Sequence, residues 1–329
     1  MNVLIVTEKP SVTRCLAPFA RKSWPDASVT FVHAVPYVNI RFAYPRGLKM
    51  REFPFLAEPG TRLVPWEKWS CQPATLAATA ELLPTEVREE LFTSADVIVS
   101  ACDVDHTGAN AFATLLEHVF GDTRYLQCPA LSIWSLDDAA IETAFKNMAP
   151  FGEICAKNLE YGRIKRYFDW NWNVNSLAIF GETQAGVGVP LDAPPMSKYA
   201  LQLLYALRDQ PPMTAGAVVQ LMHRWPGTGR YQIKPGQWHP QLGSAASRSP
   251  ILDNLSLAGL LSRTEVDGKT GVAVSPRGYA LLEMLHPDCE DPDLPYRLHA
   301  WCEQGFAAKP AINRYINTLF GKQKRFLGR

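Results

Sequence analysis

Several common features of protein sequences are missing from this one. No apolar run approaches the ~18 residues that a membrane helix needs, and no basic segment precedes the first apolar run. The seven cysteines are odd in number and never spaced C-x-x-C, so neither a disulfide framework nor a zinc site is predicted, and a reducing cytoplasm is the expected location. The seven histidines show no metal-ligand spacing. Positive and negative residues nearly cancel, at 33 and 32, so any surface for nucleic acid has to be a local patch.

The residues that are present predict a globular α/β protein of two domains. The 329 residues are 47% hydrophobic and 20% charged, which excludes a disordered chain. Residues 1–150 alternate strand-like and helix-like stretches, and this order is typical of a parallel sheet. The expected strands are 2–7, one or two within 28–42, 96–100 and 132–136, and the expected helices begin at Pro10 and span 85–92, 108–119 and 137–148.

The second half predicts an α-rich domain. A basic helical segment covers 151–180, and the glycines and prolines of 181–195 indicate a linker. Residues 196–329 then read as helices followed by two strands and a turn, which is a winged-helix-like order, and 321–329 reads as a basic tail. The expected elements are helices at 196–208, 214–224, 246–260, 294–307 and 310–320 and strands at 261–266 and 271–274.

Acidic residues follow two of the predicted buried strands. Glu8 comes after the first strand, and Asp103 and Asp105 come after a later one. Ligands in parallel α/β sheets gather at the carboxyl ends of the strands, and carboxylate oxygens suit Mg²⁺. A magnesium site on Glu8, Asp103 and Asp105 is therefore predicted. The alternative is that each acid only caps the helix that follows it.

Two segments resemble the signatures of the Toprim domain. They are Leu4-Ile-Val-Thr-Glu8-Lys9-Pro10-Ser11 and Asp103-Val-Asp105-His-Thr-Gly108, and together they are similar to type IA DNA topoisomerases, above all the topoisomerase III branch. The resemblance implies that Asp103 and Asp105 hold Mg²⁺, that Glu8 is the acid/base group at the scissile phosphate, and that Lys9 contacts phosphate.

Weaker similarities extend to other segments of the chain, and there are departures. The segments 163–170, 243–251 and 271–285 resemble the family's basic groove helix and its late conserved segments. About sixty residues stand where the family has two gate domains with the catalytic tyrosine, so a partner chain supplying gate and nucleophile is one expectation. Thr107 and Ala109 replace two further acids of the family motif.

One tyrosine has the surroundings of a nucleophile. Tyr231 lies between Arg230 and Lys234, and such cations hold the charge of an attacked phosphodiester. Tyr231 is therefore a candidate catalytic residue. The alternative, a strand tyrosine beside solvated cations, is favoured. Tyr44 also stands in a Tyr-Pro-Arg context, but within the Toprim-like segment, and is taken as coincidence.

Local basic and aromatic residues predict contacts with DNA. Charge next to aromatic faces is typical of single-strand grooves, although the aromatics could instead be core residues and the basic tail a solvated end. The candidate DNA-binding residues are Arg163, Lys165, Arg166, Trp170, Ser247, Arg248, Lys322, Lys324 and Arg325.

The preferred interpretation is a type IA topoisomerase-like protein without gate domains. It is expected to bind single-stranded, supercoiled or distorted DNA and to carry out Mg²⁺-dependent phosphodiester chemistry, alone or with a partner. Two alternatives stay open, a Toprim nuclease that uses water and a DNA-binding accessory protein without catalysis. The loss of acids at 107 and 109 favours the accessory protein, whereas Glu8, Asp103 and Asp105 oppose it.

Overall fold

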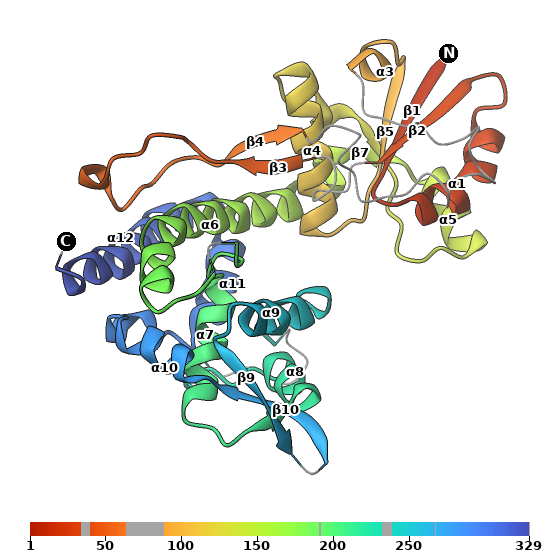
Figure 1. Ribbon diagram of the computed structural model, residues 1–329. Coiled ribbons are helices and arrows are strands. Elements are labelled where there is room, and N and C mark those ends of the chain that lie inside the picture. The colour runs from red at the N-terminus through yellow and green to blue at the C-terminus, as the bar shows by residue number, and fades with distance from the viewer. Residues whose placement is uncertain (34–39, 64–88, 191, 232–238, 267, 329) are drawn as a thin grey trace. The chain divides into compact units, whose positions relative to one another are not determined.

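A computed structural model describes most of the chain (Figure 1). The described residues are 1–33, 40–63, 89–190, 192–231, 239–266 and 268–328. They form two compact units. Unit 1 consists of Met1–Tyr44 and Pro59–Ile164, and unit 2 consists of Pro45–Glu58 and Lys165–Arg329. The division falls inside one long helix, and not at residue 150 where the sequence pattern changes.

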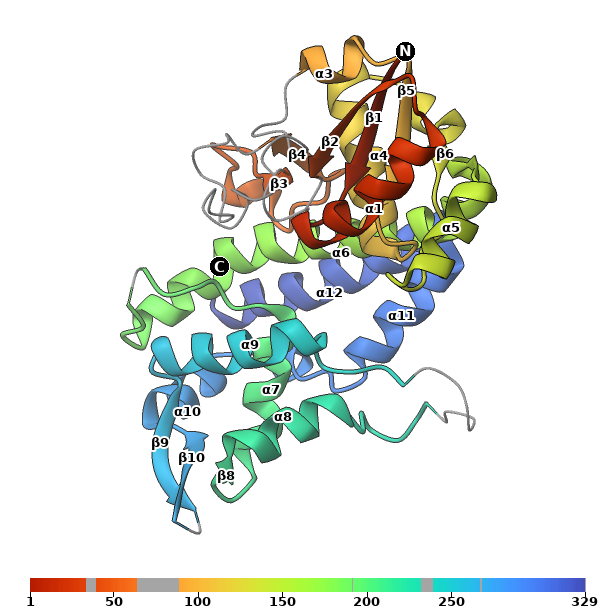
Figure 2. The same ribbon diagram turned by 90° about the vertical axis from the view of Figure 1, so that its right-hand side faces the viewer.

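Unit 1 is built on a five-stranded sheet in the order β2-β1-β5-β6-β7 (Figure 2). Its strands are β1 (Asn2–Thr7), β2 (Ser28–His33), β5 (Val97–Ala101), β6 (Pro129–Ala130) and β7 (Ala149–Pro150). β1 pairs in parallel with β2 and β5, and β5 pairs in parallel with β6, whereas β7 is antiparallel to β6. The predicted α/β class with a largely parallel sheet is confirmed.

Helices cover both faces of this sheet. Val3 and Ile5 of β1 pack with α1 (Pro10–Ser23) and α5 (Asp138–Lys146) on one face. Leu4 and Val6 pack with α4 (His106–Phe120) and the start of α6 (Phe151–Gly186) on the other face. Because side chains alternate along a strand, the unbroken apolar run of β1 fills both cores at once.

Three expectations for unit 1 need correction. Residues 132–136 are not a strand, because the strand is the two-residue β6 and the segment after it is largely exposed. The expected strands do not include residues 60–63, but the structure has β4 (Gly60–Leu63) there, and it pairs with β3 (Ile40–Ala43) as an antiparallel hairpin. The helix expected at 85–92 is seen as α3 (Glu89–Thr93), and its first four positions lie outside the described residues.

Unit 2 contains a helix-rich body and a small antiparallel sheet of order β8-β10-β9. The chain order in the sheet region is helix, strand, helix, helix, strand, strand. These elements are α7 (Lys198–Arg208), β8 (Met213–Thr214), α8 (Ala215–His223), α9 (Ala245–Leu257), β9 (Leu261–Val266) and β10 (Lys269–Val274). The helices α10 (Pro276–Glu283), α11 (Leu294–Gln304) and α12 (Lys309–Phe326) follow. The predicted helices and paired strands of this half are therefore confirmed to within a few residues.

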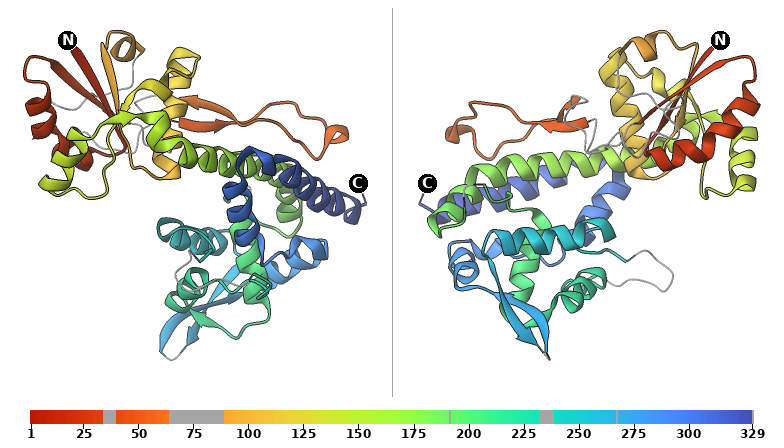
Figure 3. Two further views of the ribbon diagram at one scale, coloured as in Figure 1. Left: turned by 180° about the vertical axis from the view of Figure 1, so that it is seen from behind. Right: turned by 45° about the vertical axis from the view of Figure 1, so that its right-hand side comes forward.

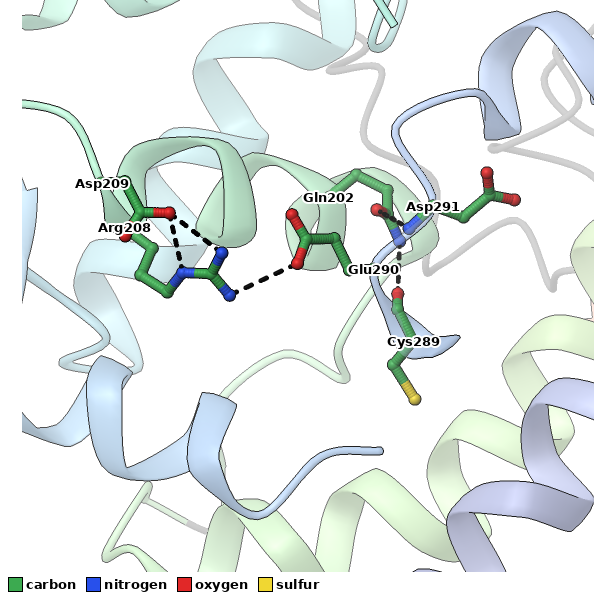
Figure 4. A network of polar contacts seen from close by, with 6 residues as sticks. All are labelled: Gln202, Arg208, Asp209, Cys289, Glu290 and Asp291. Atoms are coloured by element: carbon green, nitrogen blue, oxygen red, sulfur yellow. Dashed lines mark hydrogen bonds and ion pairs between the residues drawn. The ribbon is translucent and has the colours of Figure 1, made fainter. Parts of the chain in front are cut away.

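The second half of α6 and the helix α12 lie side by side (Figure 3). Their contact is aromatic, since the ring of Phe320 lies 5.3 Å from that of Trp172 and 5.4 Å from that of Phe180. Gln202 on α7 fixes the segment before α11, because its amide donates to Cys289 O at 2.9 Å and accepts from Asp291 N at 2.7 Å (Figure 4).

Two expectations for unit 2 are wrong at helix ends. The predicted linker begins at 181, but α6 continues to Gly186, and the Thr183 hydroxyl donates to Ile179 O within the helix. The predicted basic tail belongs to α12 as far as Phe326, because Gln323 is buried and bonds to His286 N and Met284 O. In both cases tertiary packing outweighs local propensity. Among the described residues, no helix has the length and apolarity needed to cross a membrane.

Candidate functional site

The carboxyl end of β1 places Glu8 inside unit 1. Glu8 is only 7% exposed, although it directly follows the strand. Capping does not explain it, because the N-cap of α1 is Lys9 and no side chain caps that helix. The buried Oε1 of Glu8 has no hydrogen-bond partner among the described residues. A buried carboxylate oxygen without a partner is costly, so its presence calls for a bound proton, cation or other ligand.

Asp103 and Asp105 lie at the end of the neighbouring strand. β5 runs parallel to β1, with Ala101 opposite Thr7, so the segments that follow the two strands begin at the same end of the sheet, where the strands have their carboxyl ends. Both aspartates are exposed. Asp105 also caps α4, because its Oδ1 accepts from the backbone N–H groups of Thr107 at 2.7 Å and Gly108 at 2.9 Å. The capping alternative is therefore confirmed for Asp105, where a cap and a ligand role can coexist through the two oxygens.

Gly108 allows this end of α4 to approach Glu8. A Cβ built on Gly108 would lie 2.5 Å from Glu8 Oε1 and closer still to Asp103 O, so no side chain fits there. Gly162 on α6 has a similar role, since a Cβ there would collide with His106 O in the first turn of α4. The sequence marks Gly108 only as a motif letter and gives no specific signal for Gly162, which is a single glycine in a helix-like pattern.

The electrostatics of the site disfavour an ionised Glu8. Burial raises the pKa of Glu8 to about 7, with Asp103 and then Asp105 adding to the rise. Lys9 acts in the opposite direction but more weakly. Its ammonium Nζ lies 3.9 Å from Asp103 Oδ2 and is 58% exposed, so water screens most of this ion pair. A bound cation would reverse the balance, because it favours the charged form of all three carboxylates.

The donor set suits a hard cation with open coordination positions. Within the stretches of chain that the structure describes, no three His, Cys, Asp or Glu side chains come close enough to form a metal cage. Mg²⁺ seldom uses such a cage and is usually bound through one or two carboxylates plus water and substrate phosphate. The exposed Asp103 and Asp105 and the unpartnered Glu8 oxygen are compatible with that mode.

The candidate DNA-binding residues of α6 have partners within their own units. Arg163 bonds to Glu117 and donates to the Tyr125 hydroxyl at 2.9 Å. Lys165 pairs with Asp169 at 3.0 Å in unit 2. Trp170 is 3% exposed and therefore presents no open face to a base. Arg166 is half-buried.

The same holds for the candidates near α9. Arg248 is only 8% exposed, and its guanidinium bonds to Gly243 O and Gln241 Oε1. Ser247 donates to Ser244 O at 3.1 Å in the first turn of the helix. Arg248 therefore stabilises the loop before α9 in this structure. Arg248 could bind DNA only if a DNA group replaced Gly243 O or Gln241 Oε1 as its hydrogen-bond partner.

The remaining candidates differ in exposure. Lys322 pairs with Asp288, and Lys324 donates to Met50 O at 2.9 Å, whereas Arg325 is exposed. Tyr231 is 37% exposed, and its ring stacks on Tyr296 with centroids 5.4 Å apart. Lys234, its second cationic neighbour in the sequence, lies outside the described residues. Glu8, Lys9, Asp103 and Asp105 lie together at the carboxyl ends of the paired strands β1 and β5.

Known proteins do not extend these observations. A scan of protein-family models and a search of curated proteins each found no match to this chain. The acids Glu8, Asp103 and Asp105, called the carboxylate cluster below, are therefore the feature of this chain from which a function can be inferred.

Proposed function

We propose that the carboxylate cluster binds the phosphate of a DNA strand together with Mg²⁺, and that the chain is a type IA topoisomerase-like protein without gate domains. One observation carries the proposal. Glu8 is buried with an unpartnered oxygen at the sheet edge where Asp103 and Asp105 also emerge. A buried carboxyl with an unpartnered oxygen does not stabilise the fold. In an α/β protein, ligands bind at the carboxyl ends of parallel strands, so this position supports a chemical role for Glu8.

The residues of the cluster divide the work of phosphodiester chemistry. Asp103 and Asp105 would hold Mg²⁺, which supplies charge neutralisation for the phosphate when bound. Glu8 would donate a proton to the leaving oxygen or accept one from the attacking group, because a buried carboxyl with a raised pKa can serve in either form. Lys9 is exposed beside Asp103 and would contact a phosphate oxygen.

Unit 2 supports a DNA-binding protein through its element order. The element order helix, strand, helix, helix, strand, strand, with β9 and β10 as a hairpin on the small sheet, resembles that of a winged-helix module and supports this part of the proposal. The parallel sheet of unit 1 with acids at its carboxyl edge supports a Toprim-like domain. Both assignments belong to the proposal.

The test compares matched variants on two substrates. Wild-type protein, Glu8→Gln and Asp103→Asn are incubated with negatively supercoiled plasmid and with end-labelled single-stranded DNA, in Mg²⁺ or EDTA, and resolved under denaturing conditions before and after protease. Asp26→Asn is the control, because Asp26 is exposed and lies before β2, at the amino ends of the parallel strands and away from the carboxylate cluster. We expect Mg²⁺-dependent cutting or relaxation by wild type and Asp26→Asn and its loss in both cluster variants.

The form of the product separates the alternatives. A protease-sensitive adduct would indicate a tyrosine nucleophile, and Tyr231→Phe would then be tested. Clean nicks without an adduct would indicate a nuclease that uses water. DNA that is shifted on a native gel but left intact, with and without Mg²⁺, would overturn the catalytic proposal and leave an accessory DNA-binding protein.

A further inference from the structure

One aromatic side chain of unit 1 is almost entirely exposed. Trp134 is 83% exposed, and Leu136 in the same loop is 42% exposed. Most tryptophans bury a large fraction of their area, so this ring is unusual. Within the described ranges no other ring stacks on Trp134. The ring lies outside the core of unit 1.

A hydrogen bond holds the edge of this ring that carries the indole nitrogen. The indole Nε1 of Trp134 donates to Ser132 Oγ at 2.9 Å. This bond satisfies the only polar group of the ring and leaves the apolar faces open. A tethered aromatic loses less conformational entropy when a flat ligand stacks on it than a freely rotating one does.

The loop that carries Trp134 leaves the sheet beside the carboxylate cluster. It follows β6, which pairs in parallel with β5 through Ala130 and Ser100, and Leu131 N donates to Ser100 O at 2.8 Å. Neighbouring strands lie about 4.8 Å apart. Residues 131–137 therefore begin at the carboxyl ends of the parallel strands, as Glu8 and Asp103 do. The strand before them, β6, is the second strand from β1 in the sheet.

The charges in this loop select the region of a nucleotide that it can hold. Asp137 caps α5 by accepting from Ala140 N at 2.9 Å, and Asp138 follows it. Two carboxylates disfavour a phosphate at this position. The face of a neutral base has no such conflict, and base–aromatic stacking is the usual way in which proteins bind unpaired nucleotides.

We propose that Trp134 is a stacking platform for an unpaired base of the strand whose phosphate lies at the carboxylate cluster. The inference rests on the proposed function and adds to it a residue, Trp134, that would hold an unstacked base of the strand. Bases inside a duplex already stack on their neighbours, so the platform favours single-stranded or locally opened DNA over regular duplex.

The experiment measures binding with and without bases. Fluorescence anisotropy follows labelled oligothymidylate and a fully abasic chain of the same length, both in Mg²⁺, for wild type, Trp134→Ala, Trp134→Phe and Leu136→Ala. We expect Trp134→Ala to weaken oligothymidylate binding at least about 5-fold, with Trp134→Phe retaining most of it. Binding of the abasic chain should not change. Leu136→Ala is the control for loss of apolar area in the same loop, and thermal unfolding should be unchanged because the side chain is exposed.

The outcomes separate this inference from the proposed function. Equal binding of oligothymidylate by wild type and Trp134→Ala, or an equal loss on both probes, would overturn the stacking platform. If Glu8→Gln still abolishes strand cutting in that case, the proposed function stands without it. If wild-type protein neither binds nor cuts either probe, both are wrong.

Discussion

Glu8 in unit 1 and the half-buried Asp169 in unit 2 are two carboxylates whose pKa values are shifted in opposite directions by their surroundings. Glu8 in unit 1 has a pKa raised to about 7 by burial, Asp103 and Asp105. Burial would also raise the pKa of Asp169 in unit 2, but Lys165 and Lys198 more than offset it and hold that pKa well below its usual range. Lys165 lies 3.0 Å from Asp169, and Lys198 bonds to its other oxygen.

The difference separates a structural carboxylate from one for which we propose a chemical role. Asp169 joins α6 to the start of α7 and has its charge compensated on both oxygens. Glu8 has an unpartnered oxygen and acidic neighbours, which lowers stability and preserves reactivity. Perturbed groups of the second kind cluster at functional sites.

The largest effect is expected from a substitution that removes the compensated carboxylate of Asp169. Asp169→Asn removes the carboxylate that pairs with both Lys165 and Lys198, so we expect a loss of about 3 kcal/mol in the free energy of unfolding, measured by urea denaturation at pH 7. Because the folded-state pKa is lowered, this stabilisation is present above the ordinary value of 3.8 and is lost as pH falls below it. The difference in the free energy of unfolding between Asp169→Asn and wild type should therefore be smaller at acidic pH than at pH 7.

An exposed pair provides the control for this variant. Asp122 bonds to Arg124 through both oxygens, but the two side chains are 46% and 53% exposed. Asp122→Asn should change the urea midpoint little, because water replaces the lost contacts. Equal effects of the two substitutions would contradict the structural role of Asp169.

The next effect tests the packing around Glu8. Gly108→Ala places a methyl group within 2.5 Å of Glu8 Oε1, so α4 has to shift. We expect a loss of about 2 kcal/mol in stability, measured by thermal unfolding, and a loss of Mg²⁺ binding measured by calorimetry. Gly181→Ala is the matched control, because it lies in α6 with no atom within 4 Å of its Cβ, and a gain of up to about 1 kcal/mol is expected there.

The comparison also shows which features of the molecule the sequence could predict. Glu8 stands out because an apolar run ends in an acid, and such a run has one dominant interpretation in an α/β protein. The partners of Arg163 and Arg248 could not be predicted, because Glu117 and Gln241 reach them only through tertiary packing. A basic residue in a sequence carries no sign of whether its charge is already compensated in the fold.

Helix ends show the same limit. Glycines at 181 and 186 predict the end of a helix, yet α6 passes through the first of them. The strand predicted at 132–136 has the right composition, but the strand that pairs with β5 is the two-residue β6, which ends at Ala130, and Trp134 is exposed. Local patterns predicted the type of most elements, whereas boundaries followed from contacts distant in the sequence.

The last expected effect concerns the uncompensated carboxyl. Glu8→Gln removes a group whose folded pKa, about 7, lies above the ordinary value of 4.5. Between these values the native state binds more protons than the unfolded state, so the stability of wild type falls as pH rises through this window. The variant lacks that slope and should be more stable than wild type at pH 8, by up to about 3 kcal/mol if the whole pKa difference is realised, and equal to it near pH 4. Thermal unfolding at both pH values measures the difference. A variant that is destabilised at pH 8 would show that the Glu8 carboxylate is already compensated, and the contrast with Asp169 would then be lost.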